Sequence, residues 1–332
     1  MKLEERPLLN RRSLIALAAL AMAVPAAHTA AAATFPDRAV RIIVPFPPGG
    51  SNDVIARILA ENLSQQWKQP VIVDNRSGAG GNVGAAEVAR AEPDGYTLLL
   101  SAPGPLAINP SLFANLSFNP LKDFAPIALV ANVPIVLAVN PAVKATNVKE
   151  LIALAKADPG KLNFGSSGNG STNHLAGELF ETLAGVQMVH VPYRGAAPAM
   201  NDLVAGHIPV MFDNMPAVRP QVQAGKIRAL AVCGTQRSAL FPELPTMIEA
   251  GVPGFDASAW FGLVAPVKTS PEVLKTITDA TRAALAQPEM IKKFADLGAE
   301  PGTLFGADFG KFLTVEHDKW GKVIRDAGVK IE

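Results

Sequence analysis

Short apolar runs alternate along the chain with longer stretches in which apolar residues recur every three or four positions. A short apolar run bounded by turn residues predicts a buried strand, and the longer spacing predicts an amphipathic helix. The predicted strands are residues 40–44, 70–74, 96–100, 135–139, 162–165, 188–191, 208–212 and 227–232. The predicted helices are residues 53–67, 83–91, 148–158, 172–183, 197–205, 218–224, 271–286, 289–297 and 308–327.

Repeated strand–helix units of this length predict parallel sheets that are covered by helices on both faces. Two proline-marked extended stretches, residues 125–134 and 253–266, interrupt the alternation. The helices after the second stretch need a surface to pack on, and the first block of strands offers one. We therefore predict an α/β fold with a discontinuous first domain (residues 34–132 with 259–332) and a second domain (residues 133–258). Two crossing strands would form the hinge, so that the domains can close around a ligand.

A proline- and glycine-rich turn, residues 45–53 (PFPPGGSND), connects the first predicted strand to the first predicted helix. Free backbone N–H groups at a helix N-terminus form a binding place for an anion. The prolines of this turn have no N–H to donate. The remaining donors are the N–H groups of Phe46, Gly49, Gly50, Ser51 and, as a further candidate, Asn52.

A second turn, residues 165–174 (GSSGNGSTNH), has the same relation to a strand and a helix of the second predicted domain. It adds the hydroxyls of Ser166, Ser167, Ser171 and Thr172 to its backbone donors. In open parallel sheets, ligands bind beyond the carboxyl ends of the strands. One such turn in each domain therefore predicts a cleft that holds a carboxylate or another small anion.

The start of the chain predicts export. Arg6, Arg11 and Arg12 precede an apolar run, residues 14–24, that is shorter than the roughly 20 residues of a membrane-spanning helix. Small residues that suit cleavage follow it. We expect residues 1–33 to be a cleavable signal peptide and the mature protein to be periplasmic. The Arg11-Arg12 pair leaves twin-arginine export open beside the ordinary Sec route.

Composition excludes several classes of function. The formal net charge of the 332 residues is +1, without a basic or acidic block, so nothing favours nucleic-acid binding. Cys233 is the single cysteine, which excludes an internal disulfide and a cysteine zinc site. No Gly-Lys-Ser/Thr follows the glycine turns, so a nucleotide phosphate loop is excluded as well. We expect neither a cofactor nor a metal ion.

Several short motifs recur in an order that points to a known family. They are PFPPGGSND (45–53), DNRSGAGGN (74–82), DGY (94–96), AINP (107–110), HLAG (174–177), HVPYRG (190–195), FDN (212–214), LPT (244–246), EAG (249–251) and WFGL (260–263). In number, order and spacing they resemble the Bug (TctC-like) family, the extracytoplasmic solute-binding proteins of tripartite tricarboxylate transporters. The resemblance covers essentially the whole mature chain.

This resemblance implies a type II periplasmic binding protein fold, with two doubly wound parallel-sheet domains joined by two crossing strands. It implies a monomer that captures a small carboxylate by domain closure and delivers it to a membrane transporter or a sensor. The site residues that it implies in the first domain are Phe46, Gly49, Gly50, Ser51, Asp53, Ser101, Pro103 and Gly104. Those in the second domain are Ser166, Ser167, Gly168, Gly170, Ser171, Tyr193, Gly195 and Asp213.

The chain departs from the family pattern at Pro105-Leu106, where related chains often carry small polar residues or histidine. We therefore expect the far end of the ligand to meet a partly apolar wall. Asp53 either faces the ligand or caps its own helix, and Asp213 has the same two interpretations. Arg194 either clamps a carboxylate or lies at the solvent rim, and we favour the rim.

Two classes of function remain. The first is a non-catalytic binding protein. The second is a secreted α/β hydrolase or transferase that uses Ser171, His174 and Asp213. The Gly-x-Ser-x-Gly elbow of such hydrolases is not present around Ser171, which favours the binding protein.

Overall fold

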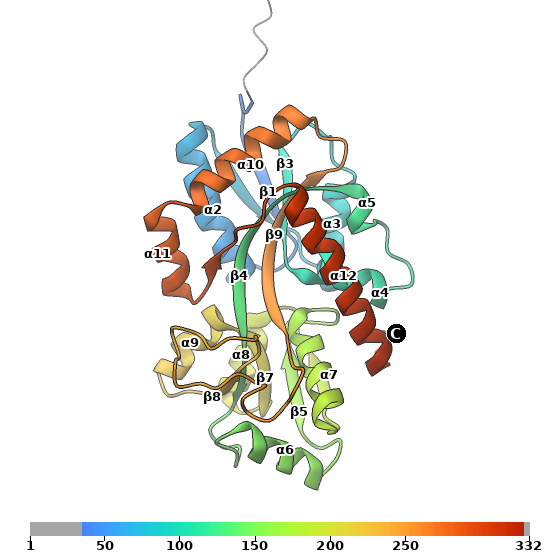
Figure 1. The fold of residues 1–332 in the computed structure, drawn as a ribbon, viewed down its shortest axis with the longest axis vertical. Helices are drawn as coiled ribbons and strands as arrows, with labels where there is room; N and C mark the ends of the chain where they lie inside the picture. The colour runs from blue at the N-terminus through green and yellow to red at the C-terminus, as the bar shows by residue number, and fades with distance from the viewer. Residues whose placement is uncertain (1–34, 329–332) are drawn as a thin grey trace, which may run out of the picture. The chain divides into compact units, whose positions relative to one another are not determined.

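Two groups of parallel strands, connected by two long strands, organise the computed structural model, which describes residues 35–328 (Figure 1). The predicted signal peptide, residues 1–33, lies outside the described residues. In the first group, β1 (Val40–Val44) pairs in parallel with β2 (Val71–Asn75) and β3 (Thr97–Ser101). The buried side chains of β1 and β3 are almost all apolar, which explains why these runs form strands covered on both sides. The helices α2 (Ser51–Trp67) and α3 (Asn82–Ala89) connect these strands.

The second group has the same construction. Strand β5 (Asn163–Ser166) pairs in parallel with β6 (Val189–Pro192) and β7 (Val210–Asn214). The helices α6 (Val148–Ala157), α7 (Thr172–Ala184), α8 (Ala196–Ala205) and α9 (Met215–Gln223) alternate with the strands of this group, and β8 (Arg228–Val232) follows them. These elements agree with the predicted boundaries to within about three residues.

The long strands β4 (Phe124–Val139) and β9 (Ser258–Pro266) run through the centre of Figure 1 and pair with each other antiparallel. Strand β9 also pairs antiparallel with β3, and β4 pairs antiparallel with β7 and β8, so both sheets are mixed. The predicted extended stretch 125–134 and the predicted strand 135–139 form this one strand, β4. Proline is compatible with an extended backbone, and the register of β4 with β9 shifts between Pro126 and Ala128 and again between Leu129 and Ala131. The division into two domains at these strands stays a prediction.

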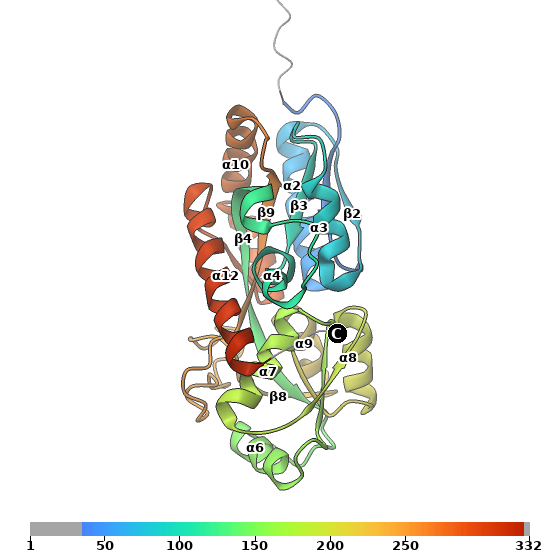
Figure 2. The same cartoon turned by 90° about the vertical axis from the view of Figure 1, so that its right-hand side faces the viewer.

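The C-terminal helices α10 (Pro271–Leu285), α11 (Pro288–Leu297) and α12 (Ala307–Ala327) return to the first group of strands (Figures 1 and 2). Helix α10 packs on α2 and β4, and α12 packs on β4 and on the segment Gly104–Ile108. A buried carboxylate connects α12 to β9, because the indole N–H groups of Trp260 and Trp320 both donate to Glu316 Oε2, at 2.8 and 3.1 Å. The short elements are Ala79–Gly81, Asn109–Leu112, Pro120–Asp123 and β10 (Glu300–Pro301).

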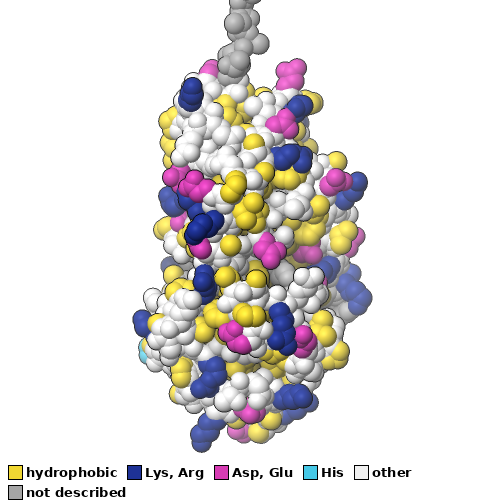
Figure 3. All heavy atoms as spheres, turned by 60° about the vertical axis from the view of Figure 1, so that its left-hand side comes forward, with side chains coloured by type: hydrophobic (Ala, Val, Ile, Leu, Met, Phe, Trp, Pro, Cys, Tyr) yellow, Lys and Arg dark blue, Asp and Glu magenta, His cyan; other side chains and the backbone are white. Residues whose placement is uncertain are grey.

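The surface agrees with the balanced charge of the sequence. On the face shown in Figure 3, basic and acidic side chains are interspersed and form no large patch of one sign. Among the described residues, no helix is long and apolar enough to cross a membrane.

Candidate functional site

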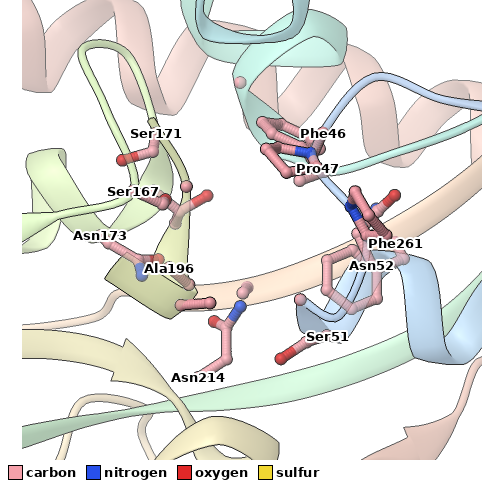
Figure 4. Close-up of a pocket in the computed structure, with 18 of the residues that line it drawn as sticks. Phe46, Pro47, Ser51, Asn52, Ser167, Ser171, Asn173, Ala196, Asn214 and Phe261 are labelled. Atoms are coloured by element: carbon pink, nitrogen blue, oxygen red, sulfur yellow. The ribbon is translucent and has the colours of Figure 1, made fainter. Parts of the chain in front are cut away.

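A cavity lies where the turns after the strands of both groups face each other (Figure 4). Its volume is about 70 Å³. One ordered water needs a cavity volume of roughly 10–15 Å³. This cavity therefore has room for a small molecule of several non-hydrogen atoms. None of the side chains that line it is charged.

Four helices begin at this cavity. The residues that cap them are Gly50 for α2, Ser171 for α7, Gly195 for α8 and Asn214 for α9, and all four line the cavity. The unpaired N–H groups of a first helical turn carry a partial positive charge of about half an elementary charge per helix. The cavity is therefore electropositive without a lysine or arginine in its wall, which suits an anion.

Hydrogen bonds to Asp53 stabilise the turn of residues 45–53. The Asp53 carboxylate accepts hydrogen bonds from Gly49 N (3.0 Å) and Asn75 Nδ2 (3.0 Å), and it pairs with Arg57 at 2.8 Å. Burial raises the pKa of Asp53, but the hydrogen bonds from Arg57, Gly49 and Asn75 outweigh it and hold that pKa below its usual value. Asp53 is only 3% exposed and lies outside the lining, so it stabilises the shape of the turn.

Two histidines, His174 and His190, stabilise the turn of residues 165–174. Ser166 Oγ lies 2.6 Å from His190 Nε2, and the rings of His190 and His174 stack with centroids 3.9 Å apart. Burial, and then the neighbouring His174, lowers the pKa of His190 to about 3, so this ring is neutral. Ser171 Oγ accepts a hydrogen bond from His174 N (3.2 Å) and so caps α7 at the edge of the cavity.

Asp213 lies behind the cavity and orients two of its lining residues. It is fully buried and accepts hydrogen bonds from Asn173 Nδ2 (2.6 Å) and Asn214 N (2.8 Å). Burial raises the pKa of Asp213 to about 6. Both asparagines line the cavity, so Asp213 positions them.

The predicted site residues fall into three sets. The cavity is lined by Phe46, Gly50, Ser51, Gly104, Ser167, Ser171 and Gly195. Gly168 and Tyr193 line a neighbouring opening, where Tyr193 Oη donates to Asp202 at 2.6 Å. The residues outside the lining of the cavity are Gly49, Asp53, Ser101, Pro103, Ser166, Gly170 and Asp213.

Sequence reasoning missed part of the wall. Asn173 and Asn214 line the cavity, as do Phe261 and Ala259 of the crossing strand. Asn52 also lines it, although the sequence suggested only its backbone N–H as a candidate donor. Asn214, followed by a proline inside the first turn of α9, is a helix-start signal that could have located one of them. Pro105 and Leu106 are buried outside the lining, so the apolar part of the wall comes instead from residues such as Phe46 and Phe261.

The hydrolase alternative is not supported by the geometry. Ser171 Oγ meets the backbone of His174, while the His174 ring faces Gly170 N (3.4 Å) and Glu178 (3.3 Å). The Asp213 carboxylate is bonded to Asn173 and Asn214 rather than to a histidine. These three side chains therefore form no Ser–His–Asp relay. Within residues 35–328, no group of three histidine, cysteine or acidic side chains is placed to hold a metal ion.

Comparison with known proteins identifies the family. Residues 55–329 match the tripartite tricarboxylate transporter family receptor. The chain belongs to this receptor family. Solved structures that are similar to this chain include a periplasmic binding protein, so the predicted family and fold class are confirmed.

Relatives of this receptor extend over most of its length. Protein BugT of Bordetella pertussis is 41% identical over 300 residues, which are 90% of this chain and 92% of that protein. The structure of R. palustris Rpa4515 with adipate has a TM-score of 0.87 at 38% identity, over 89% of this chain and 99% of that one. MatC (Rpa3494) from Rhodopseudomonas palustris with bound malate has a TM-score of 0.83 at 31% identity, over 87% of this chain and 100% of that one.

Proposed function

We propose that this receptor binds a small carboxylate in the cavity lined by the first turns of α2, α7, α8 and α9. The observation that carries the proposal is the convergence of four positive helix ends on a cavity without a charged side chain. Two relatives that have similar structures were captured with carboxylates, one with adipate and one with malate.

The ligand carboxylate would be held by backbone N–H groups of the first helical turns and by hydroxyls. The lining hydroxyls are those of Ser51, Ser167, Ser171 and Thr172. Because Ser171 Oγ already accepts from His174 N, its own proton is free to be donated to the ligand. Hydrogen bonds to an ionised acceptor are about twice as strong as neutral ones, which suits a site made of neutral donors.

The predicted site residues outside the lining would act on the ligand indirectly. Asp53, through Gly49, and Asp213, through Asn173, keep the lining groups in place. We assign the same supporting role to Ser101, Pro103, Ser166 and Gly170, while Gly168 and Tyr193 border the neighbouring opening.

Capture would proceed by closure of two domains, residues 34–132 with 259–332 against residues 133–258, about β4 and β9. The closed monomer would deliver its ligand in the periplasm to a membrane transporter or a sensor, after export directed by residues 1–33. The proposed role is binding alone, without a catalysed reaction.

Isothermal calorimetry and thermal unfolding against mono-, di- and aromatic carboxylates test this function. At a hundredfold excess over its dissociation constant, a ligand should raise the free energy of unfolding by about 2.7 kcal/mol. The fully methyl-esterified form of each binding acid is the matched control, because it keeps the carbon skeleton and removes the charge. Stabilisation by the esters alone, or by no acid of the panel, contradicts the proposal. Ester hydrolysis that is lost in Ser171→Ala would restore the enzyme alternative.

A further inference from the structure

One side chain in the wall of the cavity is buried but has no hydrogen-bond partner. Asn52, at the start of α2, is 5% exposed and lines the cavity. Neither its Oδ1 nor its Nδ2 makes a hydrogen bond within the described part of the chain. Buried polar groups are almost always paired, so an amide with both ends unpaired in a ligand-sized cavity is a group that meets a ligand.

An unpaired amide oxygen faces the same space from the other group of strands. Asn214, the residue that caps α9, has an Oδ1 that is buried and unpaired among the described residues. In Figure 4, Asn214 extends into the space between the two groups, and Asn52 lies across from it beside Phe261. Neighbouring Asn173, in contrast, is already bonded to Asp213.

We propose that Asn52 and Asn214 recognise a neutral ligand group that both donates and accepts hydrogen bonds, a hydroxyl or a primary amide, carried beside the carboxylate. This inference rests on the proposed function and names the substrate class of that site. The Nδ2 group of Asn52 can donate and its Oδ1 can accept, and Asn214 Oδ1 is a further acceptor. A hydroxyl or an amide can pair with both kinds of group at once.

Other substituents leave these groups unpaired. A carboxylate accepts from Asn52 Nδ2 but has no proton for the two Oδ1 atoms. A methylene pairs with none of them. An ammonium group donates to the oxygens, but no acidic side chain lines the cavity to balance its charge, and the four helix N-termini oppose it.

Matched pairs of acids test the inference by calorimetry on the wild-type protein. The pairs are malate with succinate, 3-hydroxyadipate with adipate, and the monoamide of adipate with adipate, and aspartate supplies the ammonium case. The hydroxyl or amide member of at least one pair should bind at least about tenfold more tightly than its partner, since leaving a buried polar group unpaired costs that much or more. Aspartate should bind more weakly than malate.

Two variants locate the effect. Asn52→Leu and Asn214→Leu keep a similar volume and should reduce the preference within the best pair to less than about threefold. Asn62→Leu, on the same helix and outside the cavity, should keep it. Equal affinity within every pair overturns the inference and leaves the proposed function intact, whereas no binding by any acid overturns both. A full preference retained in Asn52→Leu overturns the assignment to Asn52.

Discussion

The imidazole rings of His174 and His190 stack with centroids 3.9 Å apart behind the second turn of the cavity. Burial, and then the charge of the neighbouring His174, keeps His190 neutral, with a pKa lowered to about 3. Between that value and the usual 6.5, the unfolded chain binds more protons than the folded one. Stability should therefore be lost as the pH falls from about 6.5 toward 3.

Replacement of His190 by glutamine, which keeps a polar group near Ser166, should remove this contribution. For a fully buried ring, the lowered pKa of His190 would decrease the free energy of unfolding at pH 5 by about 2 kcal/mol. The partial exposure of the ring reduces this effect to on the order of 1 kcal/mol. Urea unfolding at pH 7.5 and pH 5 measures it. The loss between the two values should be smaller in His190→Gln than in the wild type by that amount. An equal loss in both proteins would show that His190 is not the responsible group.

Asp213 should act in the opposite direction. Its folded pKa is raised to about 6 by burial, so the folded protein binds more protons than the unfolded chain between about pH 4 and pH 6. This contribution to stability is present below pH 4 and is lost as the pH rises through 6. Asp213→Asn keeps an acceptor for Asn173 and cannot ionise. On going from pH 4 to pH 7, the free energy of unfolding of the variant should rise relative to that of the wild type by on the order of 2 kcal/mol. If urea unfolding shows the same pH dependence of stability in Asp213→Asn and in the wild type, Asp213 is not the responsible group.

Glu316 should be a stability determinant rather than a binding residue. Its carboxylate accepts the indole protons of Trp260 and Trp320, and it lies 3.5 Å from Lys319 Nζ. Glu316→Leu leaves two buried indole N–H groups unpaired and should cost about 2–5 kcal/mol. Glu316→Gln keeps an acceptor oxygen and should cost less than half of that. Denaturant unfolding measures both variants, and ligand affinity at a temperature where both are folded should not change. A strong loss of affinity in folded Glu316→Gln would contradict this assignment.

A side chain at Gly50 should have little effect on stability but should weaken carboxylate binding. Its φ of −79° is ordinary, and a Cβ there meets no atom within 4 Å. Gly50→Ala should cost at most about 1 kcal/mol, because alanine is a poorer helix cap than glycine. Because Gly50 lines the cavity, we expect the added methyl group to crowd the N–H donors of α2 and to lower carboxylate affinity about tenfold or more. Gly50→Ser, which restores the cap, should be as stable as the wild type and still bind weakly. Normal affinity in both variants would exclude the turn from the site.

Closure about β4 and β9 should be visible in solution. A saturating carboxylate should decrease the radius of gyration measured by small-angle X-ray scattering, because the two predicted domains approach each other. The fully methyl-esterified form of the same acid should leave it unchanged. An identical scattering curve with and without a tightly bound acid would argue for a rigid receptor.

Local patterns in the sequence were sufficient for most of the elements. Residues 40–44 form β1 as predicted, and the turn that follows leads into α2. Apolar periodicity and the special backbone of proline and glycine act over a few residues, so they can be recognised without knowledge of the fold. For the same reason, both glycine turns could be predicted as anion sites, and Gly50 and Ser171 line one cavity.

The surroundings and the pKa shifts of two aspartates depend on the tertiary structure. Asp53 and Asp213 had the same two interpretations in the sequence. In the fold, burial raises the pKa of Asp53, but hydrogen bonds from Arg57, Gly49 and Asn75 outweigh it and lower that pKa, whereas burial raises the pKa of Asp213. The difference arises from partners and burial that no local pattern specifies.

The sequence by itself determined the strands, the helices and the two turns that face the cavity. Only the tertiary structure brought the starts of α8 and α9, at Gly195 and Asn214, to the same place, and left the Asn52 amide buried without a partner. Hydrophobic periodicity is a local property of the chain. The convergence of four helix ends depends on the order in which distant strands pair, with β7 beside β4 and β4 beside β9.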